Sequence, residues 1–344
     1  MIKIKPYYRL GSKGEDMLKM YLRMVADVVP FPTEDVLYDD AEGIRLSVKK
    51  QEKRVKGAEM LIRDYSKKLH EYLYGGCKDG HVNPEKLRDL LTFTMPEGRL
   101  PERLVFKDCD KERSKQLRQN VFRYNAFSRH KDMYTLVQSF GVEVCPYCNR
   151  QFTTTVDSEK KRSRPQLDHF KNKSDYPYLA LSINNLIPSC AVCNLLKHEK
   201  DAEMVYPYEE AFGDDYVFSM KLSDDQLTPV MTGAIIAPEH FEIKLKSGER
   251  GNHALEQKIE ASMQVLALEE LYQSHRHYVA ALVFQRYIIT DAMIDDLYSQ
   301  FGERLFESRD EIRMALTLMN TQPEHWGERP LAKLTHDIQR EFDS

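Results

Sequence analysis

The sequence predicts an α+β protein in which helices are in the majority. Apolar residues recur every three or four positions over long stretches on both sides of the middle of the chain, whereas short β-branched runs lie in and just after the middle. With 344 residues, 42% of them hydrophobic, the chain is long enough to bury one large core or two smaller ones. We expect a helical N-terminal region (1–140), a central motif region (141–200) and a mostly helical, acidic C-terminal region (201–344).

The first predicted element is a long helix that begins near Val48. Its apolar stripe comprises Val55, Ala58, Ile62, Tyr65, Leu69 and Tyr72, and its opposite face carries Lys49, Lys50, Lys53, Arg54 and Lys56. A packed helix with a solvated basic face is the ordinary interpretation, and a helix that pairs with another chain or lies on DNA is the alternative. Paired glycines and Asn-Pro in GGCKDGHVNPEK then predict a turn, followed by helices over 111–127 and 131–140.

The central region predicts a hairpin, a connection and a helix. Three threonines and a valine favour a strand over 151–156, the polar run DSEKKRSR a turn, and 165–169 a return strand. A helix is predicted over 191–200. Beyond residue 201 we expect strands over 216–222 and 240–245, and then long helices from about residue 255, the last over 331–342.

The charge is distributed unevenly along the chain. Residues 145–200 carry nine basic against five acidic residues, and residues 201–344 carry 13 against 27, which leaves a net charge of +6 for residues 1–144 out of −4 overall. Neutralising phosphates requires a locally positive surface. The N-terminal and central regions therefore suit nucleic acid, and the acidic C-terminal region suits a protein partner or a solvated surface.

Two features indicate the compartment. No stretch approaches the roughly 20 apolar residues of a membrane span, and the start MIKIKPYYRLGSKGEDM lacks the apolar segment of a secretory signal. Four of the six cysteines form two C-x-x-C pairs, while Cys77 and Cys109 have no partner at comparable spacing. In a reducing compartment this distribution favours metal ligation over disulfides, so we expect a soluble, cytoplasmic protein.

The two C-x-x-C pairs predict a closed zinc site. Each pair can present two thiolates to one ion, and together they supply the four ligands of a tetrahedral site: Cys145, Cys148, Cys190 and Cys193. The alternative is four unrelated buried thiols. Because four thiolates leave no open position for water, the zinc is expected to be structural, and the reactive groups are expected among the 41 residues between the pairs and at Asn194, directly after Cys193.

Those residues suit metal-assisted hydrolysis of a phosphodiester. His169 can act as the general base, since the unperturbed pKa of histidine lies near neutrality. Asp168 and Asn194 offer the oxygen ligands that Mg²⁺ or Mn²⁺ prefers. The pair Asn184 and Asn185 can bond the backbone around His169 and fix its ring. By themselves Asp168 and His169 could equally be structural, and it is their place between the matched cysteine pairs that favours catalysis.

At these residues the sequence resembles the HNH, or ββα-metal, endonucleases. The stretches LDHF, NNLIPSC and CNLLK follow their pattern, and the surrounding cysteines are similar to those of the zinc-containing endonuclease VII branch. The resemblance implies a central zinc-stabilised ββα-metal core between helical regions, with His169 as general base, Asp168 and Asn194 on the catalytic cation and Asn185 ordering the loop. It covers about 60 residues and implies an endonuclease acting on DNA, with RNA as a further possibility.

A looser resemblance concerns HNH nucleases of bacterial anti-phage systems, such as the partners of ATPases in Septu-like and retron-linked operons. The shared phrases are CPYCNR, DHF, YPYLALS, NLIPSC and RPLAKL. This resemblance implies an effector in anti-phage defence, with an ATPase as a possible partner of the acidic C-terminal region. The alternative is a zinc-stabilised nucleic-acid-binding or assembly module whose nuclease activity is absent or depends on such a partner.

The remaining singled-out residues have weaker signals. Candidate phosphate contacts are Arg150, Lys171, Lys173 and Lys197, although exposed lysines are common. The ordinary interpretation of the other conspicuous side chains is structural, as surface or packing residues; these are His198, His275, His277 and the lone Trp326.

Overall fold

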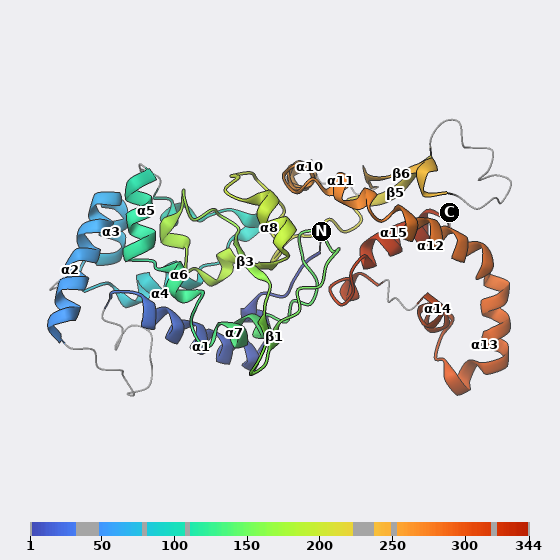
Figure 1. The fold of residues 1–344 in the computed structure, drawn as a ribbon, viewed down its shortest axis with the longest axis horizontal. Helices are drawn as coiled ribbons and strands as arrows, with labels where there is room; N and C mark the ends of the chain where they lie inside the picture. The colour runs from blue at the N-terminus through green and yellow to red at the C-terminus, as the bar shows by residue number, and fades with distance from the viewer. Residues whose placement is uncertain are drawn as a thin grey trace.

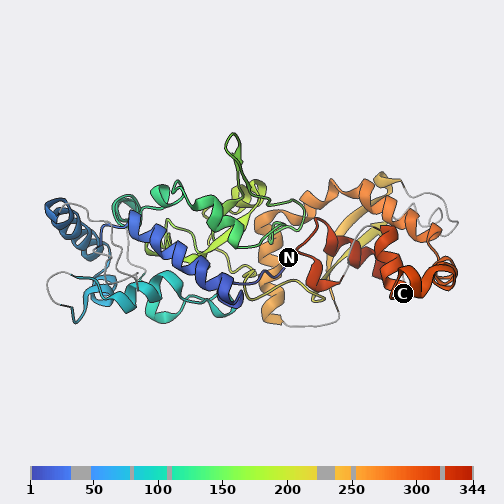
Figure 2. The same ribbon diagram turned by 90° about the horizontal axis from the view of Figure 1, so that it is seen from below.

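The protein is an elongated arrangement of helices around a small central β-structure (Figure 1). It is described here from a computed structural model, over residues 2–31, 48–77, 81–106, 111–222, 237–248, 253–317 and 322–342. Along the long axis the N-terminal helices lie at one end, β3 and α8 near the middle, and α12 to α14 at the other end (Figures 1 and 2). The mainly helical α+β class predicted from the sequence is confirmed.

The N-terminal helices form one wall of the core. They are α1 (Ser12–Val28), α2 (Val48–Tyr65), α3 (Lys67–Tyr74), α4 (Pro84–Thr92), α5 (Lys111–Asn120), α6 (Tyr124–Phe127) and α7 (Met133–Ser139). Tyr21 of α1 is fully buried, and its hydroxyl donates to the carbonyls of Leu91 and Leu181, so this helix ties α4 to the central region.

The single helix predicted from Val48 is two helices, and the prediction was wrong at residue 66. The Ser66 hydroxyl accepts a hydrogen bond from Leu69 N, which caps α3, because a serine side chain competes with the helical backbone for that donor. The apolar stripe is otherwise as predicted, with Ile62 and Leu69 fully buried and Arg54 and Lys56 exposed. The side chains of the other predicted basic residues of this face (Lys49, Lys50, Lys53) lie outside the described residues, as does Cys109.

The central region holds two hairpins and a helix. The elements are β1 (Val156–Asp157), β2 (Arg162–Ser163), β3 (Gln166–His169), β4 (Leu186–Ser189) and α8 (Ala191–Lys197). Strand β1 pairs with β2, and β3 pairs with β4, both antiparallel. The predicted pairing of 151–156 with 165–169 was therefore wrong: β3 bonds to Leu186–Ser189 instead, a short apolar run whose four residues are all buried.

The C-terminal region begins with a hairpin and continues in helices. The elements are β5 (Tyr216–Leu222), β6 (Phe241–Ser247), α10 (His253–Leu266), α11 (Leu268–Gln273), α12 (Arg276–Ile288), α13 (Asp291–Leu305), α14 (Arg309–Thr317) and α15 (Ala332–Glu341). The predicted strands are confirmed as the antiparallel pair β5 and β6. Trp326 is buried with Ile2 and Ala332, as the packing interpretation expects.

No helix within the described residues is long and apolar enough to cross a membrane. The proposed division at residues 140 and 200 stays a prediction, since the hydrophobic core runs from the N-terminal helices through β3 and β4 to α10, α12 and α15. The central region is therefore packed against neighbours on both sides. The N-terminal helices pack on one side of it and the C-terminal helices on the other.

Candidate functional site

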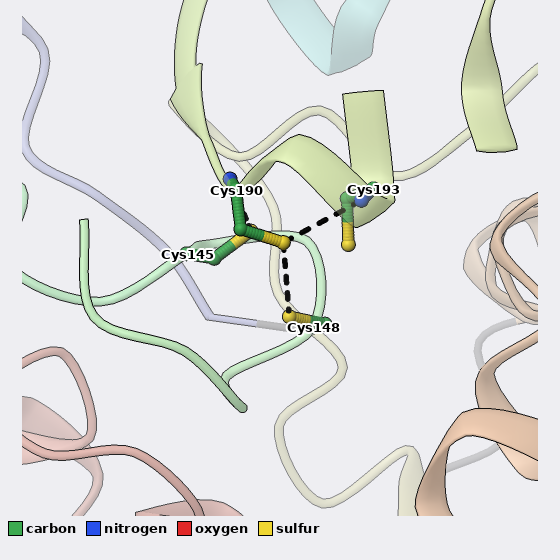
Figure 3. Close-up of side chains that lie close together, drawn as sticks. All are labelled: Cys145, Cys148, Cys190 and Cys193. Carbon is green, nitrogen blue, oxygen red and sulfur yellow. Dashed lines mark hydrogen bonds between the residues drawn. The ribbon is translucent and has the colours of Figure 1, made fainter. Parts of the chain in front are cut away.

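Four cysteines meet at one end of the central region. Cys145 and Cys148 lie on the turn before β1, while Cys190 caps α8 and Cys193 lies in its first turn (Figure 3). All four side chains are buried, and their sulfur atoms lie within 4.8 Å of one another. The backbone amides of Cys190 and Cys193 donate to the sulfurs of Cys145 and Cys190. Such N–H···S bonds stabilise thiolates.

The geometry of these sulfurs fits zinc. A tetrahedral site with Zn–S bonds of about 2.3 Å has sulfur atoms about 3.8 Å apart, and the sulfurs of Cys148 and Cys190 are separated by 3.9 Å. An all-sulfur, buried donor set selects zinc over hard cations and leaves no position for substrate. The cluster could therefore hold a structural zinc ion, with Cys145, Cys148, Cys190 and Cys193 as its ligands.

The first cysteine pair also fastens the C-terminal region to the core. Asn149 is fully buried with a left-handed backbone (φ 52°); its side chain donates to Trp326 O at 2.7 Å and accepts from Lys333 N at 3.1 Å. Its carbonyl accepts from Leu331 N at 2.6 Å. Next to it, the carbonyl of Cys148 accepts from the Tyr272 hydroxyl at 2.5 Å. Thus the phrase CPYCNR contacts the phrase RPLAKL directly.

A pocket of about 370 Å³ lies next to the cysteine cluster, formed by β3, α8, α6 and the segment after β3. Its lining comprises Tyr124, Ser128, Arg164, Gln166, Leu167, Asp168, His169, Asn172, Lys173, Asn194, His198 and Glu199. The structure therefore brings together three residues that the sequence singled out for chemistry, namely Asp168, His169 and Asn194. Asn185 lies behind this pocket rather than in its wall.

His169 is held as a neutral imidazole. Its Nε2 lies 3.0 Å from the carbonyl oxygen of Ala180, and because a carbonyl only accepts, Nε2 carries the proton and Nδ1 is the basic nitrogen. Burial, together with the positive charge of Lys173, lowers the pKa of His169 to about 3. The ring of Tyr124 packs edge-on at 4.4 Å between centroids. A neutral, oriented ring with Nδ1 unprotonated is the form that a general base needs. A pKa this low nevertheless differs from the near-neutral value expected from the sequence, and it makes Nδ1 a weaker base than a free imidazole.

Asp168 is part of a buried ion pair. The Lys197 ammonium lies 3.0 Å from one carboxylate oxygen and 3.3 Å from the other, and it also donates to the carbonyl of His169 at 2.7 Å. The Tyr147 hydroxyl donates to Asp168 at 2.7 Å. The pKa of Tyr147 is raised well above its ordinary value, mainly by burial and to a smaller extent by the negative charge of this carboxylate. A carboxylate has about four acceptor positions, so the pair leaves capacity for a cation on the pocket side.

Two asparagines fix the surroundings. The amide nitrogen of Asn194 donates to Gln166 Oε1, so the amide oxygen is the group left to bind a hard cation. Asn185 is fully buried; it donates to the carbonyls of Lys171 and Leu179 and accepts from Lys171 N at 2.7 Å. It thereby closes the loop whose next carbonyl, that of Ala180, orients His169.

Asn184 differs from its expected role around His169. Its side chain reaches the N-terminal region, where it donates to the carbonyls of Thr92 and Phe93. The Asn184 carbonyl accepts from the Tyr206 hydroxyl at 2.7 Å. Asn184 therefore fastens the central region to the end of α4, and its side chain does not bond the backbone around His169.

The four candidate phosphate contacts lie in different places. Lys173 lines the pocket, with its ammonium 4.9 Å above the ring of Tyr124. Its pKa is lowered, mainly by burial and then by the positive charge of Arg118. Lys171 is partly exposed on the same loop. Arg150 lies at the cysteine end, where it donates to His275 and Ser274 of the C-terminal region.

Lys197 requires a correction. It is 1% exposed, and its ammonium is enclosed by Asp168 and the backbone of His169. A phosphate cannot reach it in this arrangement, because the side chain points from α8 toward Asp168 and His169 of β3 rather than toward solvent. Lys197 supports the pocket from below.

Sequence reasoning missed several residues of the site. Tyr147 was available as the aromatic inside the first C-x-x-C pair, but nothing in its spacing indicates a bond to Asp168. Tyr124 lines the pocket from a helix outside the motif region, and Arg164 lines it from within that region, where sequence reasoning assigned it no role in the site. His198, interpreted as a surface residue, is exposed but also lines the pocket, directly after the end of α8.

A comparison with protein families agrees with this geometry. Residues 145–200 match the family model described as HNH endonuclease. No curated protein and no solved structure matches the chain. The chain thus contains an HNH endonuclease domain with a four-cysteine cluster that could hold zinc, and this indicates a nuclease that acts on nucleic acid.

Proposed function

We propose that the protein is a metal-dependent endonuclease that hydrolyses DNA phosphodiester bonds at the pocket around His169. One observation carries the proposal: the HNH family match and the pocket coincide, so that a neutral imidazole, a carboxylate and a carboxamide line one cavity. Asp168 and Asn194 would hold a divalent cation, Mg²⁺ or Mn²⁺. The four cysteines would hold a structural zinc ion.

In this mechanism the protein's own groups position and deprotonate water. Nδ1 of His169 accepts the proton of a water molecule in the pocket, and the Ala180 carbonyl stabilises the resulting imidazolium through its bond to Nε2. The bound cation would supply charge stabilisation for the scissile phosphate and the leaving oxygen. Lys197 and Tyr147 hold the Asp168 carboxylate in place, and Lys173, which lines the pocket, would contact an incoming phosphate.

The test is His169→Ala on nicking of supercoiled plasmid in Mg²⁺ or Mn²⁺. We expect a loss of about 10²- to 10⁴-fold in rate, because a general base contributes about that factor. Zinc content and melting temperature should stay at wild-type values. His253→Ala is the control, since that histidine is exposed on α10 and outside the pocket lining. Unreduced cutting by a well-folded His169→Ala variant would show that the base is assigned wrongly.

A role in bacterial anti-phage defence is the finer part of the proposal. It is supported only by the resemblance of the phrases CPYCNR, DHF, YPYLALS, NLIPSC and RPLAKL to those of nucleases in such systems. An ATPase would bind the acidic C-terminal region. Nicking that increases only when a co-purified ATPase and nucleotide are added would support a regulated effector, whereas equal activity of the isolated chain would contradict it.

One observation favours the alternative, a nucleic-acid-binding or assembly module. Both oxygens of Asp168 already contact the Lys197 ammonium, which competes with a cation for the same carboxylate. A module of this kind would bind DNA without cutting it, with Mg²⁺ and with a partner present. Titration of Mn²⁺ by isothermal calorimetry into wild type and Asp168→Asn separates the two, since an endonuclease requires a site that the variant loses.

A further inference from the structure

The hairpin of β1 and β2 projects from the central region as a narrow two-stranded ribbon, visible at the top of Figure 2. Every residue from 156 to 163 is exposed, including Val156 at 46%. The ribbon therefore contributes almost nothing to the core. An isolated two-stranded hairpin is at best marginally stable in water, so its persistence here requires another explanation.

Cations hold the base of this hairpin. The Arg162 guanidinium pairs with Asp157 across the strands at 2.7 Å and lies 4.9 Å above the ring of Tyr134 on α7. The Arg164 guanidinium donates to Ser128 O at 3.1 Å, at the end of α6. The ribbon is thus clamped to the N-terminal helices, and its direction relative to the pocket is fixed.

Beyond the clamp, the tip is basic. The tip Ser158-Glu159-Lys160-Lys161 is closed by the backbone and hydroxyl of Ser158, which bond to Lys161, and its two lysines outweigh the single acid Glu159. Both lysines are exposed. From the tip the chain runs directly through Arg164, which lines the pocket, to Asp168 and His169. Positive side chains therefore extend from the tip to the site of cutting.

We propose that the β1–β2 hairpin is a finger that binds duplex nucleic acid beside the bond to be cut. This deepens the proposed function and rests on it for the place of the cut. A two-stranded ribbon has the width that a major groove admits, and lysines at its tip neutralise phosphates. Asp168 is seven positions after Lys161. At about 3.3 Å per position, the tip can lie up to about 23 Å from the pocket, which is the length of roughly seven base pairs.

The surroundings favour a duplex over a single strand. Proteins that hold single strands present open aromatic faces on which bases stack. Beside this pocket, the rings of Tyr124 and Tyr134 are each covered by a cation, Lys173 and Arg162 respectively. What remains accessible is charge suited to phosphates. The exposed ring of Phe152, at 60%, lies before the hairpin and provides a separate test.

The experiment measures binding without cutting. Lys160→Ala/Lys161→Ala is made in the His169→Ala background, and fluorescence anisotropy follows a duplex of about 30 base pairs and the matching single strand. Two lost phosphate contacts lower the salt slope by about 1.8, so the ratio of wild-type to variant duplex affinity should fall about twelvefold between 50 and 200 mM salt. Lys67→Ala/Lys68→Ala, an exposed pair on α3, is the matched control.

The outcomes are distinct. A duplex-specific loss in the hairpin variant, with the control unchanged and melting temperatures equal, supports the finger even if the wild-type protein cuts nothing, in which case only the proposed function fails. Equal losses on both substrates, equal losses in the control, or an unchanged hairpin variant overturn it. A larger loss of duplex affinity with Phe152→Ala than with the lysine pair would also overturn it.

Discussion

The cysteine cluster and the His169 pocket are neighbours on the same β3–β4–α8 unit, but they are built on different principles. At the cysteine end, four soft sulfur donors are buried and closed to substrate. At the pocket end, hard oxygen and nitrogen donors line an open cavity. Cys193 and Asn194 follow one another on α8, so one helix carries residues of both sites.

The neighbours of the two ends differ as well. The cysteine end is bonded to the C-terminal region through Asn149, Arg150 and Tyr272. The pocket end is walled by the N-terminal helix α6 through Tyr124 and Ser128. The closed sulfur cluster therefore lies where regions of the fold are joined, whereas the open pocket lies where the proposed reaction would take place.

Removing zinc should have the largest effect. Structural zinc contributes on the order of 10 kcal/mol to the free energy of folding. Cys193→Ser, or prolonged treatment with a strong chelator, should therefore abolish the cooperative melting transition seen by calorimetry. Mass spectrometry should show the loss of one zinc ion per chain. Omitting Mg²⁺ should leave melting unchanged. A zinc-free protein with the wild-type melting temperature would break the comparison.

The second prediction concerns the support beneath the pocket. Lys197→Met removes one partner of a buried ion pair and leaves the charge of Asp168 with Tyr147 alone, which should cost about 3–5 kcal/mol in urea unfolding. Because the charge left unpaired causes the loss, Asp168→Asn/Lys197→Met should recover more than half of it. Additive losses in the double variant would show that the pair is not coupled.

The third prediction concerns the attachment of the C-terminal region. Asn149→Ala removes two buried side-chain hydrogen bonds, and alanine must then adopt the left-handed backbone (φ 52°) without their support. We therefore expect the free energy of unfolding to fall by about 2–4 kcal/mol and α15 to be proteolysed faster. Asn149→Gly is the matched control, because glycine adopts this backbone freely and should cost about 1–2 kcal/mol less. Equal losses would leave the left-handed backbone without an energetic role.

The sequence predicted what depends on local spacing. The cysteine set follows from two C-x-x-C pairs, and β5 follows from a β-branched and aromatic run. Pairing of distant segments was harder to predict: β3 bonds to β4 because the buried loop between them closes through Asn185, and no residue within β3 specifies that partner. The inward direction of Lys197 depends in the same way on where β3 lies against α8.

The smallest effect should come from His275, where α12 meets the cysteine end. Its Nε2 accepts a hydrogen bond from Arg150 at 2.9 Å, which requires a neutral ring, and burial followed by Arg150 lowers its pKa. The unfolded chain therefore binds the proton first, so stability is complete above about pH 6.5 and falls as the pH drops below it toward the lowered folded value. Since the ring is half-buried, the loss between about pH 7 and pH 5 should stay below about 1 kcal/mol.

His275→Gln isolates this contribution. Glutamine does not titrate, so the difference between wild-type and variant urea midpoints should shrink as the pH falls, while proton competition for the zinc thiolates affects both proteins alike. A constant difference from pH 7 to pH 5 would mean that the contact between Arg150 and His275 does not depend on the neutral ring. In that case the attachment of the cysteine end to the C-terminal region would not depend on pH, and the bonds of Asn149, Tyr272 and Arg150 to that region would persist when His275 is protonated.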